Sequence, residues 1–250
     1  MANELFRRFA ALHVSGDPLV LFNIWDAGSA LAVVKAGAKA IATGSASVAM
    51  ANGFGDGENL PMEFALANAR RIAESVDLPV TVDFEGAYSN DADEGARNIA
   101  ELAATGVVGC NFEDQVVGGE GLHSIDVQAQ RIAAARAAVG PDFFINVRTD
   151  LFLKVPQEAH DGAMLDEAIA RGRAYAEAGA SGFFVPMLGD LDLLRRLCDE
   201  SAIPVNFMTY PGCPSNAEVA ATGVARVSHG PFPHMALMKQ LEEAAGEALA

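Results

Sequence analysis

Residues 80–88 read V-T-V-D-F-E-G-A-Y, an apolar stretch that ends in two carboxylates one residue apart and then reaches Gly86. Because side chains alternate between the two faces of a strand, Asp83 and Glu85 are expected to point the same way. Two like charges so close repel each other and are costly to bury unless a cation, a proton or an arginine compensates them. The stretch therefore predicts a buried strand whose end needs a charged partner.

Seven further short apolar runs resemble this strand, and Ala-rich helical patterns separate them. The eight expected strands cover residues 19–24, 40–44, 79–85, 106–114, 142–148, 182–187, 204–209 and 225–229. The expected helices between them cover residues 27–36, 61–76, 90–104, 125–138, 162–178, 189–200, 214–222 and 232–248. Eight such units in 250 residues favour a closed (β/α)₈ barrel, the TIM barrel of the α/β class, over an open doubly wound sheet. We predict a single barrel domain over residues 1–250, with an additional N-terminal helix at 2–13.

The composition narrows the classes of partner. The chain carries 17 basic and 33 acidic residues, a formal charge of −16 that disfavours nucleic acid and anionic membrane surfaces. No apolar run is suited to a signal peptide or a membrane-spanning helix, so we expect a cytoplasmic protein. Three cysteines without C-x-x-C spacing argue against a disulfide framework and a structural zinc site. An anionic small molecule can still bind to this acidic protein, because at contact distance a local metal or arginine outweighs the diffuse charge of the surface.

Polar residues gather at the expected strand ends, where barrel enzymes carry their catalytic groups. These residues are Trp25, Asp26, Gly44, Ser45, Ser47, Asp83, Glu85, Glu113, Asp114, Gln115, Asn146, Arg148, Asp150 and Asn206. Mg²⁺ prefers oxygen ligands, which Asp83, Glu85 and Glu113 offer without histidine or cysteine. Arg148 follows an apolar run and needs an anion, either a nearby acid such as Asp150 or a substrate carboxylate.

Several of these residues keep a structural alternative. Asp26 either caps the following helix or contacts substrate. Ser45 and Ser47 either cap a helix or present hydroxyl and amide groups to a carboxylate. The histidines lack a two-histidine metal spacing and are expected to be structural or exposed; they are His123, His160, His229 and His234.

Six phrases, in this order, carry a resemblance that covers nearly the whole chain. They are F-N-I-W-D-A-G-S-A, A-T-G-S-A-S-V-A, P-V-T-V-D-F-E-G-A-Y, G-C-N-F-E-D-Q, F-I-N-V-R-T-D and A-E-A-G-A-S-G-F-F-V-P. Together they resemble the isocitrate lyase and phosphoenolpyruvate mutase superfamily. The resemblance implies a barrel enzyme that binds Mg²⁺, with Mn²⁺ as an alternative, and handles α-keto acids or their C–C or C–P bonded precursors.

The resemblance also implies roles for the strand-end residues. Asp83, Glu85 and Glu113 would form the metal shell, partly through water, and Ser45 with the amides of its neighbours would hold the substrate carboxylate. With the strand-end pattern, the predicted catalytic residues are Arg148, Glu113 and Asp26. The predicted substrate-binding residues are Trp25, Gly44, Ser45, Ala46, Asn206 and His123.

Two features differ from the better-studied members of that superfamily. Glu85 stands where those members commonly carry aspartate. The segment after the fourth strand reads E-D-Q-V-V-G-G-E-G-L-H-S and lacks both the K-[KR]-C-G-H loop of the lyases and the lysine and asparagine of the phosphonate mutases. His123 is then the candidate proton donor. We predict a short phosphoenolpyruvate mutase-like member that is not an authentic isocitrate lyase.

The leading functional hypothesis is an Mg²⁺-dependent lyase that cleaves a C–C bond of a small 2-hydroxy or α-keto dicarboxylate or tricarboxylate through a stabilised enolate. One alternative is oxaloacetate decarboxylation or phosphonopyruvate-type C–P mutase or hydrolase chemistry. Another is a non-catalytic barrel that binds a metal and a carboxylate. The superfamily resemblance further implies a homo-oligomer, a dimer or tetramer, in which residues 232–248 are exchanged between subunits; packing of this helix on its own barrel is the alternative.

Overall fold

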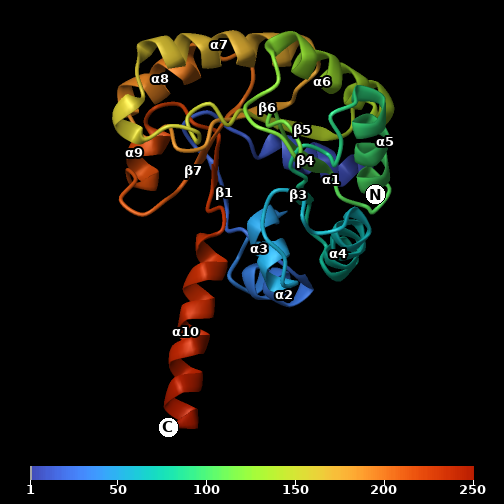
Figure 1. Ribbon diagram of the computed structural model, residues 1–250, viewed down its shortest axis with the longest axis vertical. Helices are drawn as coiled ribbons and strands as arrows, with labels where there is room; N and C mark the ends of the chain where they lie inside the picture. Colours follow the sequence, from blue (N-terminus) through green and yellow to red (C-terminus); the bar gives the residue numbers. More distant parts are fainter. Residues whose placement is uncertain (1) are drawn as a thin grey trace.

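The computed structural model describes residues 2–250 and contains one sheet of eight parallel strands (Figure 1). They are β1 (Leu19–Leu21), β2 (Ile41–Ala42), β3 (Val80–Asp83), β4 (Gly109–Glu113), β5 (Phe144–Arg148), β6 (Gly182–Phe184), β7 (Val205–Met208) and β8 (Arg226–Ser228). The strands pair in the order β1-β8-β7-β6-β5-β4-β3-β2, and an isolated bridge from Ile24 to Thr43 links the two ends. The sheet is a nearly closed barrel, which confirms the predicted fold class.

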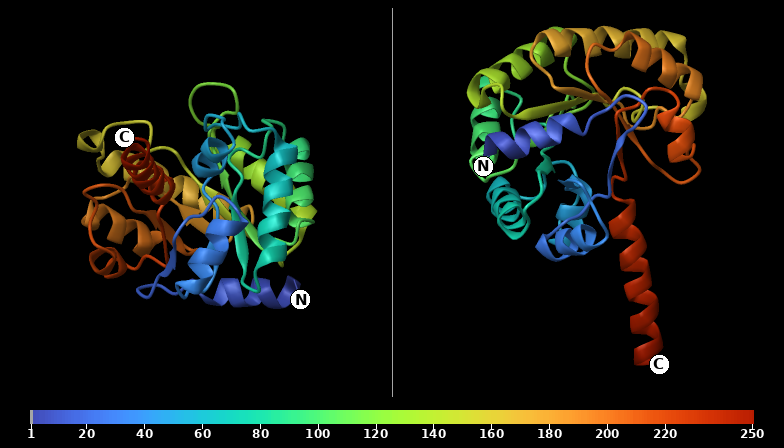
Figure 2. Two further views of the ribbon diagram at one scale, coloured as in Figure 1. Left: turned by 90° about the horizontal axis from the view of Figure 1, so that it is seen from below. Right: turned by 180° about the vertical axis from the view of Figure 1, so that it is seen from behind.

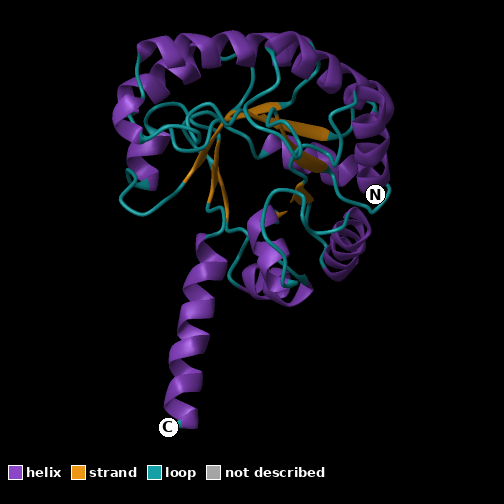
Figure 3. Cartoon of the chain, viewed as in Figure 1, coloured by secondary structure: helices purple, strands orange, loops and turns teal. Residues whose placement is uncertain are grey.

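Helices alternate with the strands and cover the outside of the sheet (Figure 3). They are α1 (Ala2–Ala11), α2 (Ala27–Lys35), α3 (Ser45–Ala51), α4 (Met62–Ser75), α5 (Ala92–Ala103), α6 (Ile125–Val139), η1 (Gln157–Ala159), α7 (Gly162–Glu177), α8 (Leu191–Glu200), α9 (Asn216–Ala220) and α10 (Phe232–Leu249). The sequence patterns did not predict α3 or the 3₁₀ turn η1. The N-terminal helix ends at Ala11 rather than at residue 13, because the amides of Leu12 and His13 form turn bonds to Phe9 and Ala10.

Two apolar layers hold the barrel together. The larger one lies between the strands and the surrounding helices and includes the buried Cys110. The smaller one fills the barrel interior, where Phe9 of α1 packs edge-on against Phe144 with 5.3 Å between the ring centroids. Because α1 contributes to this interior cluster, the amino-terminal end of the barrel is covered. The opposite end of the barrel, formed by the carboxyl ends of the strands, is where barrel enzymes carry their active sites.

Helix α10 projects away from the barrel (Figure 2). Only its first turn is buried, through Pro233 and His234. Its later apolar side chains are exposed; they are Met235, Leu237, Met238, Leu241 and Leu249. The alternative in which this helix packs along its own barrel is therefore not the arrangement that the structure adopts. Within residues 2–250, no helix combines the length and the hydrophobicity that a bilayer crossing requires.

Candidate active site

A pocket of about 230 Å³ opens at the carboxyl ends of the strands. It is smaller than the roughly 300–1,000 Å³ of a typical drug-sized site, so it suits a small metabolite. Its polar lining comes from six segments of chain and comprises Asn23, Ser45, Asp56, Asp83, Asn111, Arg148 and Ser228. The predicted residues Gly44 and Ala46 also line it. The barrel thus brings together residues more than two hundred positions apart in the sequence, such as Asn23 and Ser228.

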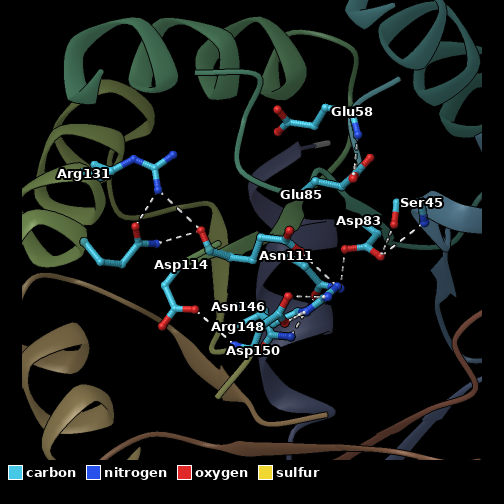
Figure 4. Close-up of polar contacts among 12 residues, drawn as sticks. Ser45, Glu58, Asp83, Glu85, Asn111, Asp114, Arg131, Asn146, Arg148 and Asp150 are labelled. Carbon is cyan, nitrogen blue, oxygen red and sulfur yellow. Dashed lines mark hydrogen bonds and ion pairs between the residues drawn. The ribbon is translucent and has the colours of Figure 1, made fainter. Parts of the chain in front are cut away.

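Asp83 is held in a fixed orientation at the edge of this pocket (Figure 4). Its Oδ2 accepts hydrogen bonds from the Ser45 amide at 3.2 Å and from the Ser45 hydroxyl at 3.0 Å. Its Oδ1 accepts one from Asn111 Nδ2 at 3.1 Å. The facing registers of β3 and β4 place Asp83 beside Asn111, which explains the contact. Asp83 is therefore an oriented carboxylate, with Ser45 at the start of α3 as its partner.

Glu85 lies just beyond β3 in a backbone conformation that non-glycine residues rarely adopt. Its φ is +50°, and Ala87 and Tyr88 have φ values of +62° and +57°. Such left-handed conformations cost free energy and cluster at functional sites. Gly86 is required within this turn, because a Cβ there would lie 2.5 Å from a methyl carbon of Val117. The turn directs Glu85 toward the loop after α3, where its Oε2 accepts a 2.8 Å hydrogen bond from the Glu58 amide (Figure 4).

The Glu85 carboxyl group sits among other acids. Burial, together with the charges of Asp56, Asp83 and Glu58, raises its pKa to about 8. The sequence analysis did not single out Asp56 or Glu58, which lie in the loop G-D-G-E. The signal that could have found them is the combination of acids and glycines directly after a strand-end helix. The acid group around Asp83 is thus larger than the sequence predicted.

We expect the metal-free protein to lose stability as the pH rises from about 6 to 8. The folded state keeps a proton on Glu85 up to its pKa of about 8, whereas the unfolded chain releases that proton near pH 4.5. The free energy of unfolding therefore falls by up to about 1.4 kcal/mol per pH unit from this one group. Over this pH range, the free energy of unfolding of Glu85→Gln should fall by about 2 kcal/mol less than that of wild type. Urea denaturation in the presence of a chelator, at about pH 6 and about pH 8, measures the free energy of unfolding of both proteins. An equal loss of this free energy in wild type and in Glu85→Gln would contradict the prediction.

Arg148 is paired twice within the barrel. Its Nη1 lies 3.0 Å from Glu113 Oε2, and its Nε and Nη2 donate to the two oxygens of the fully buried Asp150. Burial raises the pKa of Glu113 well above its ordinary value, against the lowering effect of the Arg148 charge. The two acids raise the pKa of Arg148, so the guanidinium stays charged. The anion that the sequence required for Arg148 is supplied by these neighbouring acids.

A buried arginine outside the pocket holds the two acid-bearing loops together. Arg131 of α6, labelled in Figure 4, is this residue. It donates to the carbonyl oxygens of Gly86 at 2.6 Å, Ser89 at 2.7 Å and Glu113 at 3.4 Å. Gln128 also donates to the Glu113 carbonyl oxygen at 3.1 Å. The turn after β3 and the end of β4 are therefore fixed to the same helix. Sequence reasoning missed this role because Arg131 lies in the middle of a helical pattern.

The donor set fits a hard divalent cation that keeps part of its water shell. Within residues 2–250, no three histidine, cysteine or acidic side chains stand close enough to hold an ion by themselves. Mg²⁺ needs only one or two carboxylates and retains several waters. Asp83 is oriented at the pocket edge, and the acids near Glu85 repel one another, a repulsion that a dication would relieve. Glu113 points to Arg148 instead, so its predicted metal contact would run through water.

Six predicted site residues do not line this pocket: Glu85 and Glu113, described above, and Trp25, Asp26, His123 and Asn206. Asp26 caps α2, with its Oδ1 accepting from the Ser29 amide at 2.7 Å, and lines a separate outer groove with Trp25. His123 is bound through its backbone to Asp114 and Arg171 and does not line the pocket. Asn206 is buried below it, where its Oδ1 accepts from Asn146. Asp26 therefore caps a helix, which is the first of its two predicted roles. Trp25, His123 and Asn206 do not reach the pocket surface.

The fold and the pocket define a class, the (β/α)₈ barrels with an acid-rich site at the carboxyl ends of the strands. The chain belongs to the phosphoenolpyruvate phosphomutase family, which it matches over residues 9–249. An uncharacterized Mycobacterium tuberculosis protein is 35% identical over 228 residues, which cover 91% of this chain and 83% of that protein. The Escherichia coli 2-methylisocitrate lyase is 30% identical, over 80% of this chain and 68% of the lyase.

Solved structures agree with this assignment. A candidate phosphonomutase from Burkholderia cenocepacia J2315 superposes with a TM-score of 0.96 at 47% identity, over 99% of this chain and 100% of that structure. These relatives confirm the predicted superfamily and place the chain among lyases and mutases.

Proposed function

We propose that the protein is an Mg²⁺-dependent lyase that cleaves a C–C bond of a small 2-hydroxy or α-keto carboxylate. The observation that carries the proposal is the oriented Asp83 carboxylate at the pocket edge, between Ser45 and Asn111 and on the same pocket as Arg148. When bound, Mg²⁺ would supply positive charge to the enolate that bond cleavage leaves on the substrate. The name of the related 2-methylisocitrate lyase supports this reaction class.

The remaining steps belong to residues of this chain. Asp83 would hold the metal directly, with Glu85 and Glu113 acting through water. The Ala46 amide at the start of α3 would bind the substrate carboxylate. The other two predicted donors are occupied, because the Gly44 amide donates to the Ile24 carbonyl oxygen at 3.2 Å and the Ser45 amide and hydroxyl donate to Asp83. The charged Arg148 would stabilise negative charge that develops on the substrate.

A pocket carboxyl group is also available for proton transfer. Asp56 lines the pocket, and burial and the charge of Asp83 raise its pKa. A raised pKa makes a carboxyl group better able to hold a proton for transfer to a substrate. We therefore assign this role to Asp56 in preference to His123, which does not line the pocket. The absence of a loop cysteine in residues 113–124 supports a member other than an authentic isocitrate lyase.

A second candidate function is decarboxylation or C–P chemistry on the same enolate. A relative named oxaloacetate decarboxylase, from Pseudomonas savastanoi, is 28% identical over 94% of this chain. The structure that superposes at 47% identity is a candidate phosphonomutase. Product analysis separates these reactions, because decarboxylation releases CO₂, C–P hydrolysis releases phosphate, and C–C lysis releases a second carbon fragment.

Isothermal titration of oxalate, a planar mimic of the pyruvate enolate, tests the site. We expect binding that requires Mg²⁺ and is weakened in Glu113→Ala, followed by release of a keto acid in a substrate screen. Absence of binding with and without Mg²⁺ would overturn the lyase proposal. Metal-dependent oxalate binding without turnover of any C–C, C–P or decarboxylation substrate would favour the non-catalytic alternative instead.

We also propose that α10 is exchanged between subunits of a dimer or tetramer. The helix projects from the barrel (Figure 2). Its apolar side chains beyond the first turn are exposed. Beside its base lies an apolar groove of about 730 Å³, lined by Val20, Phe22 and Trp25 among others. An apolar helix and an apolar groove on one chain can satisfy each other when two copies associate.

Substitution on the apolar face of α10 should disrupt that assembly. We expect Leu241→Glu to convert an oligomer into a monomer at micromolar concentration, because the charge would be buried in the partner's groove. Ala236→Glu is the matched control, since residue 236 is exposed and lies on the opposite side of the helix. Light scattering after size-exclusion chromatography reports the mass. A monomeric wild-type protein would contradict the exchange.

A further inference from the structure

A second buried arginine lies inside the barrel, beneath the pocket. Arg226 is the first residue of β8 and is 1% exposed. Residues two apart on a strand share a face, so Arg226 lies one layer below Ser228, which lines the pocket. Burial lowers the pKa of Arg226 to about 10, which is still well above neutral pH, so the guanidinium stays charged. The barrel interior therefore contains a full positive charge on the side of the pocket floor.

This charge has few partners. Its Nη2 donates to Asn111 Oδ1 at 3.2 Å, whereas its Nε and Nη1 have no hydrogen-bond partner within residues 2–250. None of the ion pairs in that part of the chain includes Arg226. The neighbouring His13 is neutral, because burial and the charge of Arg226 lower its pKa to about 3. A buried charge without an ion pair is unfavourable for folding, so its presence requires an explanation.

Asp83 is the carboxylate on which this charge acts. The negative charge of Asp83 raises the pKa of Arg226, against the larger effect of burial. Asn111 lies between the two groups, because its Oδ1 accepts from Arg226 and its Nδ2 donates to Asp83 Oδ1 at 3.1 Å. An arginine side chain has no acceptor, so the amide must present its oxygen to Arg226 and its nitrogen to Asp83. Arg226 and Asp83 thus form an ion pair that one amide group separates.

The charge of Arg226 also acts on what binds in the pocket. Asp56 and Asp83 line the pocket and attract a dication, whereas the guanidinium below them repels it. An anionic ligand experiences the opposite forces. Because Arg226 is buried, water and salt screen its field less than they screen a surface charge. Its position therefore allows it to affect both ligands without touching either.

We propose that Arg226 is the buried counter-charge of the candidate active site, which weakens the binding of Mg²⁺ alone and strengthens the binding of an anionic ligand to the Mg²⁺-loaded pocket. This inference rests on the proposed function, because it assumes that Mg²⁺ and a carboxylate ligand share the pocket. Mg²⁺ and oxalate carry equal and opposite charges, so the two effects of Arg226 nearly cancel for the pair. Arg226 thus decides how the binding energy is divided between metal and ligand.

Two variants that remove the charge test this proposal. Arg226→Met and Arg226→Gln both leave Asn111 bound to Asn146, whose Nδ2 donates to the same Asn111 oxygen at 2.8 Å. Calorimetry measures the binding of Mg²⁺ alone to each metal-free protein, and then the binding of oxalate at saturating Mg²⁺. In both variants we expect the affinity for Mg²⁺ alone to rise at least about tenfold and the affinity for oxalate to fall at least about tenfold. The product of the two affinities should stay nearly constant.

The opposite signs separate a role of the charge from a structural role. Damage to the packing would weaken the binding of both ligands, and a role as hydrogen-bond donor alone would leave Arg226→Gln like wild type. Either result, or two unchanged affinities, would overturn the proposal. Arg226→Gln decides the question if Arg226→Met does not fold.

Arg196→Met is the matched control, because Arg196 is exposed on α8 and its loss changes the net charge equally. Both affinities should keep their wild-type values in this variant, and shifts as large as those of the Arg226 variants would overturn the proposal. If wild type failed to bind oxalate in the presence of Mg²⁺, the proposed function would be wrong and this inference with it. Wild-type binding of oxalate without the opposite shifts would overturn this inference alone.

Discussion

In the Asp83→Asn variant, Mg²⁺-dependent binding of oxalate should weaken by at least about 100-fold. Asparagine keeps the size of the side chain but removes the negative charge that a hard cation requires. Two neighbours orient Asp83, namely Ser45 and Asn111, and both remain in the variant. The change therefore acts on the charge of the carboxylate rather than on the shape of the pocket. Titration of oxalate into the variant with and without Mg²⁺ measures the effect.

A control separates the loss of a ligand from the loss of a surface charge. Asp93 lies exposed in the first turn of α5, so Asp93→Asn changes the net charge by the same amount without touching the pocket. Wild-type affinity is expected for this variant. If Asp83→Asn also bound oxalate normally, Asp83 would not be the metal ligand and the proposed site would be wrong.

Replacement of Arg148 should cause the second large effect, on stability. Arg148→Met leaves the carboxylates of Glu113 and Asp150 without their cation, and the Asp150 side chain is fully buried. Breaking a buried ion pair in this way typically costs about 3–5 kcal/mol in the free energy of unfolding. Urea denaturation at neutral pH measures the loss. The double variant Arg148→Met with Glu113→Gln should recover part of it, because one unpaired charge is removed.

An exposed arginine provides the comparison for this experiment. Arg196 pairs with Asp166 and Glu200 on the protein surface, where water already solvates the charges. Arg196→Met should therefore denature at nearly the same urea concentration as wild type. A loss below about 1 kcal/mol in Arg148→Met would indicate that its pairs are solvated too, contrary to their burial.

The fold was predictable because most strands and helices have a recognisable pattern in their own residues. All eight strands were located, since short apolar runs such as residues 142–148 alternate with longer helical patterns. Helix α3 was missed because its polar face is absent: Ser47, Val48 and Ala49 are all buried, so no helical alternation is visible in the sequence. The predicted strands were also longer than the observed ones, because apolar residues continue beyond the last ladder hydrogen bond.

The candidate site was predictable only in part. Strand parity places Asn111 with Glu113 and Asn146 with Arg148 on one face of the sheet, and the parallel register brings Asp83 to Asn111 and Glu113 to Arg148. Parity is a property of the backbone, so the sequence suffices for it. Asp56 and Glu58 escaped prediction because they lie in a loop whose path depends on what it packs against.

The sequence by itself determined the barrel fold, the superfamily and the positions of acids at the strand ends. Strand alternation and helical periodicity are patterns of neighbouring residues, so they can be recognised without the structure. Only the tertiary structure decided which of those acids share a pocket. It paired Arg148 with two acids, turned Glu85 toward Glu58 and placed Asp26 at a helix cap outside the pocket. It also left the apolar side chains of α10 exposed, without a partner on its own barrel. These outcomes depend on contacts between residues far apart in the chain, which no local pattern specifies.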